Sequence, residues 1–390
     1  MAQPSSNILR FTGHLYIRQR LVLSLLSGRT VRIGGIRSDD VNPGLRDHEI
    51  SLLRLLSKIT NGSIIDISTT GTSLLFTPGV LLGGHHTHDC PLSVSVGYFL
   101  EPLSQLAFWG KKDLSLTLRG ITSGRKDLGV DLIRTYLLPT MQLFGELEGL
   151  ELKIVKRGAE PLGGGEILFR CPSIRSVKTL NFVDPGRVKR IRGVAHSVRV
   201  SPQFSNRLVE SSRSLLNPLI PDIYIYTDPY KSAESGLSPG YGLSLLSEST
   251  TGAMHCAEVG YEKGSLETPE DVGRATAALL LSEISGGGCV GTYGQGFVLL
   301  AMVLGSEDVG RVRLGKLSAN SIQLMRDIRT FFSTTFKITP VKPTVASKSS
   351  AESDQDEDDD ESTAVSAPKK EEFILSCLGV GFSNVNKSVV

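Results

Sequence analysis

The sequence predicts a mixed α/β (α+β) fold, with a large domain of three repeated units and a smaller α/β insert domain. Three observations support this prediction. The same order of elements, helix, strand, helix, strand, strand, occurs three times along the 390 residues. A segment with its own strands and helices separates the second unit from the third. Hydrophobic residues make up 40% of the chain and charged residues 21%, which is typical of a globular protein, and the length allows two domains.

The first unit begins with a predicted helix at residues 15–26 and a basic strand at residues 30–37. The second helix is predicted within residues 44–62, because apolar residues recur at helical spacing and an Asn-Gly pair ends the pattern. Two short strands, at residues 64–68 and 73–77, complete the unit before the Pro-Gly turn that follows them.

The second and third units repeat this order with negligible sequence identity, so the repeat rests on the order of the elements alone. The elements of the second unit are a helix at 92–109, a strand at 114–120, a helix at 127–144 and strands at 151–157 and 166–171. Those of the third are a helix at 297–304, a strand at 311–315, a helix at 318–332 and strands at 336–338 and 373–382. We therefore expect three α/β units around one core.

The insert reads as strand, helix, three strands and a helix, at residues 194–200, 206–216, 223–227, 243–247, 255–259 and from Thr268 onward. Thr268, Pro269 and Asp271 form a capping arrangement at the start of the last helix. The predicted domains are residues 1–183 for the first two units, 184–285 for the insert, and 286–339 with 373–390 for the third unit. Residues 340–372, rich in Pro, Ser, Lys and acids, are predicted to be a disordered acidic linker.

The net charge of +2 conceals an uneven distribution of charge. Residues 351–362 hold eight acids and no base, so the rest of the chain carries 2 + 8 = +10. A basic body with an acidic tail suits a nucleic acid or a ribonucleoprotein as partner, and a solvated surface is the alternative. No apolar run reaches the roughly 18 residues of a membrane helix, so we expect no membrane partner. The five scattered cysteines indicate reduced thiols in the cytosol or nucleus.

Two stretches resemble sites of chemistry. Residues 286–305 form a glycine-rich turn that runs into an apolar helix, a place where backbone N–H groups can approach a phosphate. The turn at residues 291–295 has no histidine or acid, and Cys289 stands ahead of it. The other stretch holds five potential zinc ligands without a matched second pair, in what we expect to be a solvent-facing loop: His85, His86, His88, Asp89 and Cys90. We predict neither a metal nor a cofactor.

Basic residues recur in the predicted strands and the loops beside them. They are Arg32 and Arg37 in the first unit, Arg119, Arg125 and Lys126 in the second, Arg190 and Arg192 in the insert, and Arg311, Arg313 and Lys316 in the third. Equivalent positions in repeated units are expected on one face, where they would form a composite anion surface for RNA or an acidic protein. Arginines on edge strands also serve solubility, which is the alternative.

A charged triplet lies in the last long helix. Arg326 and Arg329 are three residues apart and share a face, with Asp327 between them as a possible base or orienting group. Salt bridging within the helix is the other interpretation.

Several strings resemble the RNA 3′-terminal phosphate cyclase family over nearly the whole chain outside the acidic linker. They are NPGL at residues 42–45, PGVLLGG at 78–84, EPLGGGEI at 160–167, RIRG at 190–193 and SPGYGLSL at 238–245. The resemblance implies a nucleophilic histidine four residues ahead of a glutamine. With Gln295 as that glutamine, the position of the nucleophile is occupied by Gly291, which cannot form a phosphoramidate. The glycine-rich N-terminal loop of the cyclases is also replaced, by residues 12–20.

The chain is similar to the eukaryotic cyclase-like branch of this family, through IRGVAHSVRVSPQ at 191–203, IPDIYIYTD at 220–228, GGCV at 287–290 and CLGVGFSN at 377–384. This resemblance implies a non-cyclase protein of the nucleus and nucleolus that acts in small-subunit (40S) ribosomal RNA maturation. The implied partners are a large GTPase of the small-subunit processome and the pre-ribosomal particle with its pre-rRNA and snoRNP. The alternative that the resemblance leaves open is an endonuclease of pre-rRNA that uses Arg326, Asp327 and Arg329.

Overall fold

The computed structural model describes residues 8–231, 234–262, 264–341 and 371–387, and it confirms the mixed α/β fold class. Most of the predicted linker, residues 342–370, lies outside the described residues. Three of the four-stranded sheets have one common order, in which the first two strands are parallel and the other two are added antiparallel.

The first of these sheets has the order β1-β2-β5-β4. Its strands are β1 (Leu9–Thr12), β2 (Val31–Gly34), β5 (Leu74–Thr77) and β4 (Ile64–Ile67), and its helices are α1 (Ile17–Ser27) and α2 (Asp47–Ile59). A two-stranded ribbon of β3 (Thr60–Asn61) and β6 (Val80–Leu81) follows α2.

The second sheet, β7-β8-β10-β9, consists of β7 (Gly84–Asp89), β8 (Leu114–Gly120), β10 (Gly165–Cys171) and β9 (Glu151–Lys156). Its helices are α3 (Gly97–Leu106), which continues as a 3-10 turn at Ala107–Trp109, and α4 (Val130–Leu132) and α5 (Leu138–Gln142), which are joined by a π-turn at Ile133–Leu137. Pro139 follows this turn and cannot donate the N–H of a regular helix, which accounts for the local π geometry.

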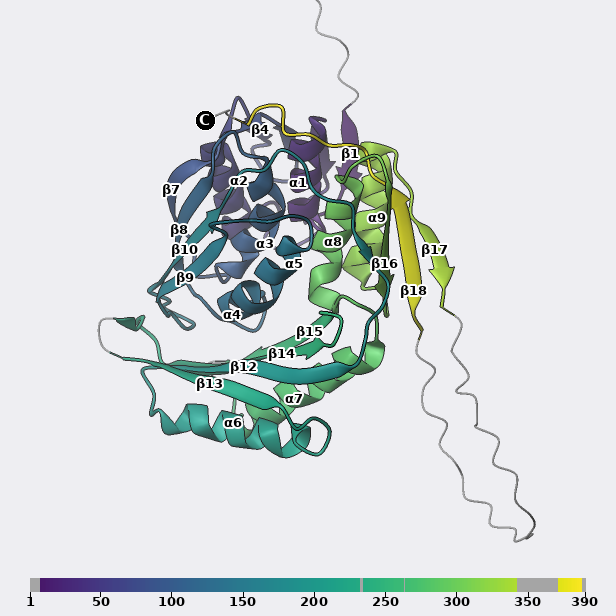
Figure 1. Ribbon diagram of the computed structural model, residues 1–390. Helices are drawn as coiled ribbons and strands as arrows, with labels where there is room; N and C mark the ends of the chain where they lie inside the picture. The colour runs from purple at the N-terminus through teal and green to yellow at the C-terminus, as the bar shows by residue number, and fades with distance from the viewer. Residues whose placement is uncertain (1–7, 232–233, 263, 342–370, 388–390) are drawn as a thin grey trace, which may run out of the picture.

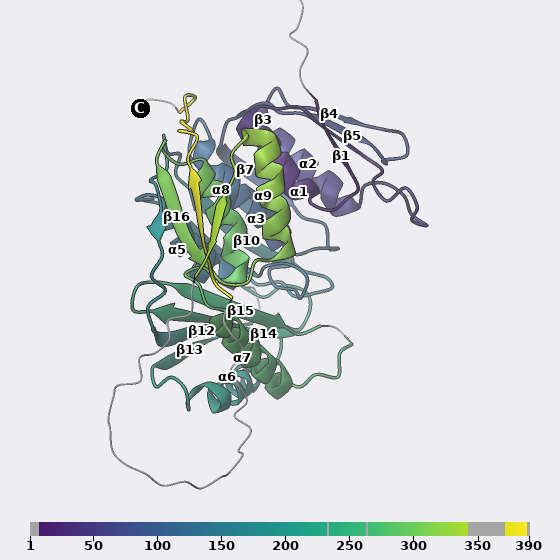
Figure 2. The same ribbon diagram turned by 90° about the vertical axis from the view of Figure 1, so that its right-hand side faces the viewer.

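The third sheet, β11-β16-β18-β17, consists of β11 (Asn181–Phe182), β16 (Val309–Leu314), β18 (Phe373–Leu378) and β17 (Lys337–Pro340). Its helices are α8 (Gln295–Val303) and α9 (Ala319–Phe332). In Figures 1 and 2 the three sheets lie around the outside of the helices, although α9 stands at the surface in Figure 2, and the buried side chains of the sheets and helices form one large hydrophobic core.

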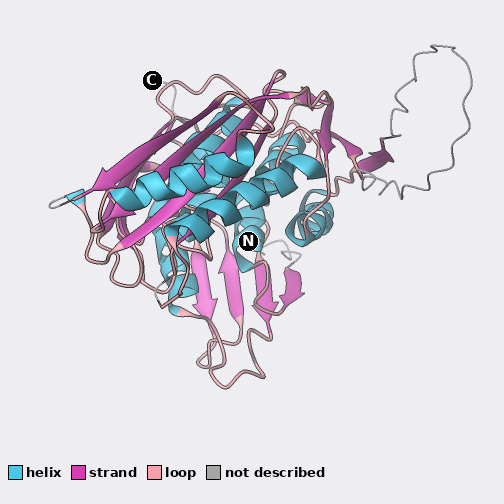
Figure 3. Cartoon of the chain, turned by 90° about the horizontal axis from the view of Figure 1, so that it is seen from below, coloured by secondary structure: helices cyan, strands magenta, loops and turns pink. Residues whose placement is uncertain are grey.

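The remaining sheet, β13-β12-β14-β15, belongs to the insert. It contains β12 (Val188–Val198), β13 (Ile223–Tyr230), β14 (Gly240–Ser249) and β15 (Met254–Gly260), with α6 (Gln203–Leu216) and α7 (Pro269–Gly286). Figure 3 shows both helices across the face of the sheet that points away from the rest of the molecule, where a separate hydrophobic cluster forms. The predicted cap of α7 is confirmed, because Thr268 and Asp271 exchange side chain to backbone hydrogen bonds.

Some predicted elements require correction. The strands β1, β7 and β11 were not predicted, and β12 begins six residues before the predicted strand. The histidine-rich stretch is not a loop but β7, which pairs in parallel with β8. Pro340 and Glu372 of the predicted linker lie in the structure, at the end of β17 and just before β18. In the described part of the chain, no helix is both long and apolar enough to cross a membrane.

Candidate functional site

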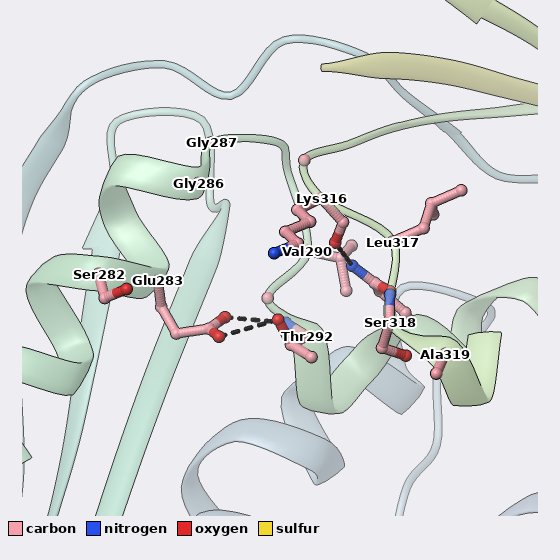
Figure 4. Close-up of a pocket in the computed structure, with 13 residues that line it drawn as sticks. Ser282, Glu283, Gly286, Gly287, Val290, Thr292, Lys316, Leu317, Ser318 and Ala319 are labelled. Atoms are coloured by element: carbon pink, nitrogen blue, oxygen red, sulfur yellow. Dashed lines mark hydrogen bonds between the residues drawn. The ribbon is translucent and has the colours of Figure 1, made fainter. Parts of the chain in front are cut away.

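A pocket of about 310 Å³ lies beside Gly291, between the end of α7 and the start of α8 (Figure 4). Its walls are the last turns of α7, the glycine-rich turn at residues 286–292, and the connection from β16 to α9. The first residues of two helices, Gln295 of α8 and Ala319 of α9, also line it. The stretch singled out by the sequence therefore does form a concave surface.

Two glycines of this turn are required by the backbone, whereas Gly291 is not. Gly287 and Gly288 have φ of 71° and 85°, in the region that favours glycine. Gly291 has φ −66° and ψ 166°, which any residue can adopt. A Cβ atom at Gly291 would find its nearest atoms, Oε2 of Glu283 and Cα of His255, at 3.4 Å, which is ordinary van der Waals contact. A side chain could therefore be carried at position 291 without backbone strain.

Hydrogen bonds fix the walls of the pocket. The carboxylate of Glu283 accepts from the backbone N–H of Thr292 at 3.0 Å and from its hydroxyl at 2.8 Å. The amide of Gln295 donates to the Lys316 carbonyl at 3.0 Å and accepts from the Ser318 N–H at 3.1 Å. Gln295, which is 1% exposed, thus ties the start of α8 to the turn before α9.

The pocket is poor in nucleophiles. Among the described residues that line it there is no histidine and no cysteine, and Lys316 is the one cation. Cys289 lies within the turn but does not line the pocket, and burial raises the pKa of its thiol to about 12, so it is not a thiolate at neutral pH. His255 lies behind Gly291, with its Nε2 3.2 Å from the Gly287 carbonyl oxygen. The pocket can bind a ligand by hydrogen bonds and one ammonium group.

Most of the predicted anion-binding side chains are already neutralised by acids. The pairs are Arg37 with Glu49, Arg119 with Glu166, Arg125 with Glu267, Arg190 with Glu248, Arg192 with Asp222, and Arg313 with Glu372. The Arg37 pair is the most enclosed, with two hydrogen bonds of 2.8 and 2.9 Å and both side chains nearly buried.

The structure does not bring the basic strands together on one face. Arg32 on β2, Arg119 on β8 and Arg311 on β16 are exposed on strands whose alternate residues are buried against the helices. Since the three sheets surround the helices, their outer faces point in different directions (Figures 1 and 2). Arg32, Lys126 and Arg311 form no ion pair with any residue that the structure describes, so they remain separate cations rather than one surface.

The charged triplet of α9 is divided between the surface and the interior. Arg326 and Arg329 are exposed, but Asp327 is 2% exposed and packs toward α1. Its two oxygens accept hydrogen bonds from Gln19 at 2.6 Å and Gln323 at 2.8 Å, and Nε of Arg20 lies 3.5 Å away. The expectation that Asp327 stands between the two arginines as a base needs correction, because its carboxylate faces the opposite side of the helix.

The histidine-rich stretch has alternating surroundings, as expected of a strand. His88 is buried, with Nε2 2.8 Å from the Ser51 hydroxyl, and burial lowers its pKa. Cys90 is also buried, and burial raises its pKa to about 12. No group of three potential metal ligands occurs within the described ranges.

A buried charge cluster between the large domain and the insert was not predicted. Arg157, just after β9, is fully buried and donates to both oxygens of Asp131, at 2.6 and 2.7 Å, and to Asp228 of β13 at 2.7 Å. Burial alone would raise the pKa of Asp131, but the charge and hydrogen bonds of Arg157 outweigh this effect and lower the pKa of Asp131 to about 2. Burial lowers the pKa of the adjacent His196 to about 4, and burial also raises that of Glu258 to about 8. No local motif marks these residues, because they lie far apart in sequence.

The comparisons with known proteins agree with the resemblance. The family model described as RNA 3′-terminal phosphate cyclase matches residues 9–338. The chain is 47% identical over 385 residues to the RNA 3′-terminal phosphate cyclase-like protein of Homo sapiens, covering 98% of each chain. It is 44% identical over 389 residues to the rRNA processing protein rcl1 of Schizosaccharomyces pombe, covering 99% of each, and 38% identical over 393 residues to the rRNA processing protein RCL1 of Saccharomyces cerevisiae, covering 100% of each.

Proposed function

Because this chain belongs to the RNA 3′-terminal phosphate cyclase family, we propose that it acts in ribosomal RNA processing as a binding module and not as a cyclase. Two full-length relatives are named rRNA processing proteins, which supports a role in ribosomal RNA processing and hence work in the nucleus. The proposal extends this role to the small subunit, to the nucleolus, and to a large GTPase and the pre-ribosomal particle as partners.

The observation that carries the proposal is the pocket without a histidine. Covalent nucleotide transfer to a histidine needs an imidazole that opens onto the substrate. The described residues lining the pocket include no histidine, and Gly291, where the resemblance implies the nucleophile, has no side chain. Hydrogen bonds of Glu283 and Gln295 hold the shape of the turn. These contacts support a pocket that binds a ligand but lacks the histidine that a cyclase needs.

The endonuclease alternative has less support. A general base must reach the proton that it abstracts, within about 3 Å or through one water. Asp327 instead accepts two hydrogen bonds from glutamine amides inside the α1–α9 contact and is shielded from solvent. Arg326 and Arg329 remain available on the surface of α9, where they suit the binding of an acidic partner as well as of phosphate.

Replacement of the endogenous protein by a tagged copy tests the proposed function. We expect purification of the tagged chain to recover small-subunit pre-rRNA. We also expect depletion of the protein to reduce the amount of mature small-subunit RNA while large-subunit RNA is still made. Recovery of unrelated RNA with normal pre-rRNA processing would contradict the proposal.

A second arm of the experiment addresses cleavage. The purified full chain is incubated with a pre-rRNA fragment that spans the small-subunit processing sites, and the products are resolved by primer extension. We expect no cut. A specific cut that disappears in Arg326→Ala/Arg329→Ala, with the fold of that variant verified by circular dichroism, would favour the endonuclease instead.

A further inference from the structure

One face of the insert sheet is only partly covered. α6 and α7 cover the opposite face (Figure 3). Ile223 and Ile225 of β13 are buried beneath these helices. Alternate residues of a strand point to opposite faces, so Tyr224, Tyr226 and Asp228 share the face that points toward the large domain.

The large domain covers this face at β14 and β15 but not at the outer end of β13. Cys256 of β15 packs with Leu132 and Tyr136 of the large domain in a small apolar cluster. Farther along β13, Asp228 is held by Arg157. Beyond these contacts, Tyr224 is 64% exposed and Tyr226 54% exposed. We refer to Tyr224 and Tyr226 as the tyrosine pair.

Arginines of the neighbouring strand lie beside the tyrosine pair. Arg192 of β12 is in register with Tyr224. Arg190 stands two residues earlier in an uninterrupted register with β14, and therefore on the same face. Their partners, Asp222 and Glu248, form ion pairs that are partly open to solvent. Exposed pairs of this kind contribute about 0–1 kcal/mol, so a phosphate can replace either carboxylate at little cost.

The local charge favours an acidic partner over an apolar one, and the two aromatic rings favour a nucleic acid among acidic partners. Residues 187–193 contain four basic residues, Arg187, Lys189, Arg190 and Arg192, and the two acids that pair with them leave 4 − 2 = +2. Two aromatic rings at alternate positions of one strand, about 6.6 Å apart at 3.3 Å per residue, can each accept a base. Bases are accessible for such stacking in single strands and not in a duplex.

We propose that the tyrosine pair stacks against bases of single-stranded RNA while Arg190 and Arg192 contact its phosphates. This inference rests on the proposed function and adds to it a defined surface and a defined class of RNA. It also accounts for two of the basic residues that the sequence singled out, through a local surface on the insert rather than a composite one over three sheets.

The test measures the affinity of the full chain for a fluorescently labelled 12-nucleotide single-stranded RNA by anisotropy, with the same sequence as a duplex for comparison. Tyr224→Ala/Tyr226→Ala should weaken binding by roughly 5- to 150-fold for each base that loses its stack. Tyr224→Phe/Tyr226→Phe is the matched control and should bind as the unaltered chain does, because the rings remain. Arg190→Ala/Arg192→Ala should weaken binding and lower its dependence on salt.

Several outcomes would overturn the inference. One is that the alanine variant of the tyrosine pair binds the single-stranded RNA as tightly as the unaltered chain, and another is that the phenylalanine variant loses as much affinity as the alanine variant. The others are that the unaltered chain prefers the duplex or does not bind single-stranded RNA. Circular dichroism and urea unfolding of each variant show whether it is folded. If the alanine variant binds RNA normally but loses a protein from the purified particle, the surface docks a protein and the inference fails. If the tyrosine pair proves not to bind RNA but the tagged chain still recovers small-subunit pre-rRNA, the inference fails and the proposed function stands.

Discussion

Arg157 is a residue whose loss should strongly affect stability. Its guanidinium is fully buried and bridges Asp131 of the large domain and Asp228 of the insert, with Tyr230 beneath it at 5.2 Å. Removing one member of a buried ion pair leaves an unpaired charge away from water, which costs about 3–5 kcal/mol. Arg157 therefore cannot be removed alone without destabilising the contact between the two parts of the molecule.

We expect Arg157→Met to lower the free energy of unfolding by about 3–5 kcal/mol, because Asp131 keeps a buried charge without its main partner. Arg134→Ala is the matched control. Arg134 also reaches Asp131, at 3.3 Å, but its side chain is 38% exposed, so its loss should cost less than about 1 kcal/mol. Urea unfolding followed by circular dichroism measures both. Equal effects of the two substitutions would contradict this account.

At the residue scale the sequence reveals which groups are charged but not what they face. Arg37 and Arg313 were expected to contact a ligand, yet Glu49 and Glu372 already bind them. Asp327 meets Gln19 from the other end of the chain, a contact that no local pattern can predict. The absence of a histidine or acid at residues 291–295, in contrast, could be read directly, because it concerns the residues themselves and not their partners.

At the element scale, structures with local causes were predicted, whereas three strands that pair in parallel were not. The cap of α7 depends on residues three apart in sequence, so Thr268 and Asp271 identified it. The strands β1 and β11 have four residues or fewer, and β7 is masked by its histidines and flanking glycines. Each of these three strands is stabilised by parallel pairing with a strand that comes later in the chain. The periodicity of one segment cannot reveal such a pairing.

The two ends of the segment at residues 342–370 are already joined by the sheet. β17 and β18 are antiparallel, and the N–H of Val341 donates to the Glu372 carbonyl at 2.8 Å. The Glu372 side chain binds Arg313 and accepts from the Gly288 N–H at 3.0 Å. The hairpin is therefore closed by contacts outside the segment.

Replacing residues 342–370 by Asn-Gly should leave the melting temperature unchanged or raise it slightly, because a shorter loop has less entropy to lose on closure. Glu372→Ala in the full chain is the contrasting variant. It leaves Arg313 and a backbone N–H without their acceptor and should destabilise the protein by about 1–3 kcal/mol. Thermal unfolding compares the two. A fall of several degrees on deletion would show that the segment contributes to the fold.

At the scale of the whole molecule, three sheets of one topology surround a common helical core, and the insert meets this body through a charged contact. The order of elements in the sequence was enough to predict the fold class. It could not predict the directions of the outer faces, since these depend on how the sheets close around the helices. For that reason the basic strands do not form one binding surface. The tyrosine pair with Arg190 and Arg192, on the insert, is a more compact candidate surface for RNA.

The central claim is that this member of the family binds without the chemistry of a cyclase, and a labelling experiment tests it most directly. The purified full chain is incubated with Mg²⁺, ATP labelled at the α-phosphate, and RNA that ends in a 3′-phosphate, with an active cyclase in parallel. We expect no label on the denatured protein and no cyclic phosphate on the RNA. Label attached to the protein, together with a cyclised RNA end, would contradict the claim. Loss of that label in Lys316→Ala would point to the deprotonated amine of Lys316 as the nucleophile.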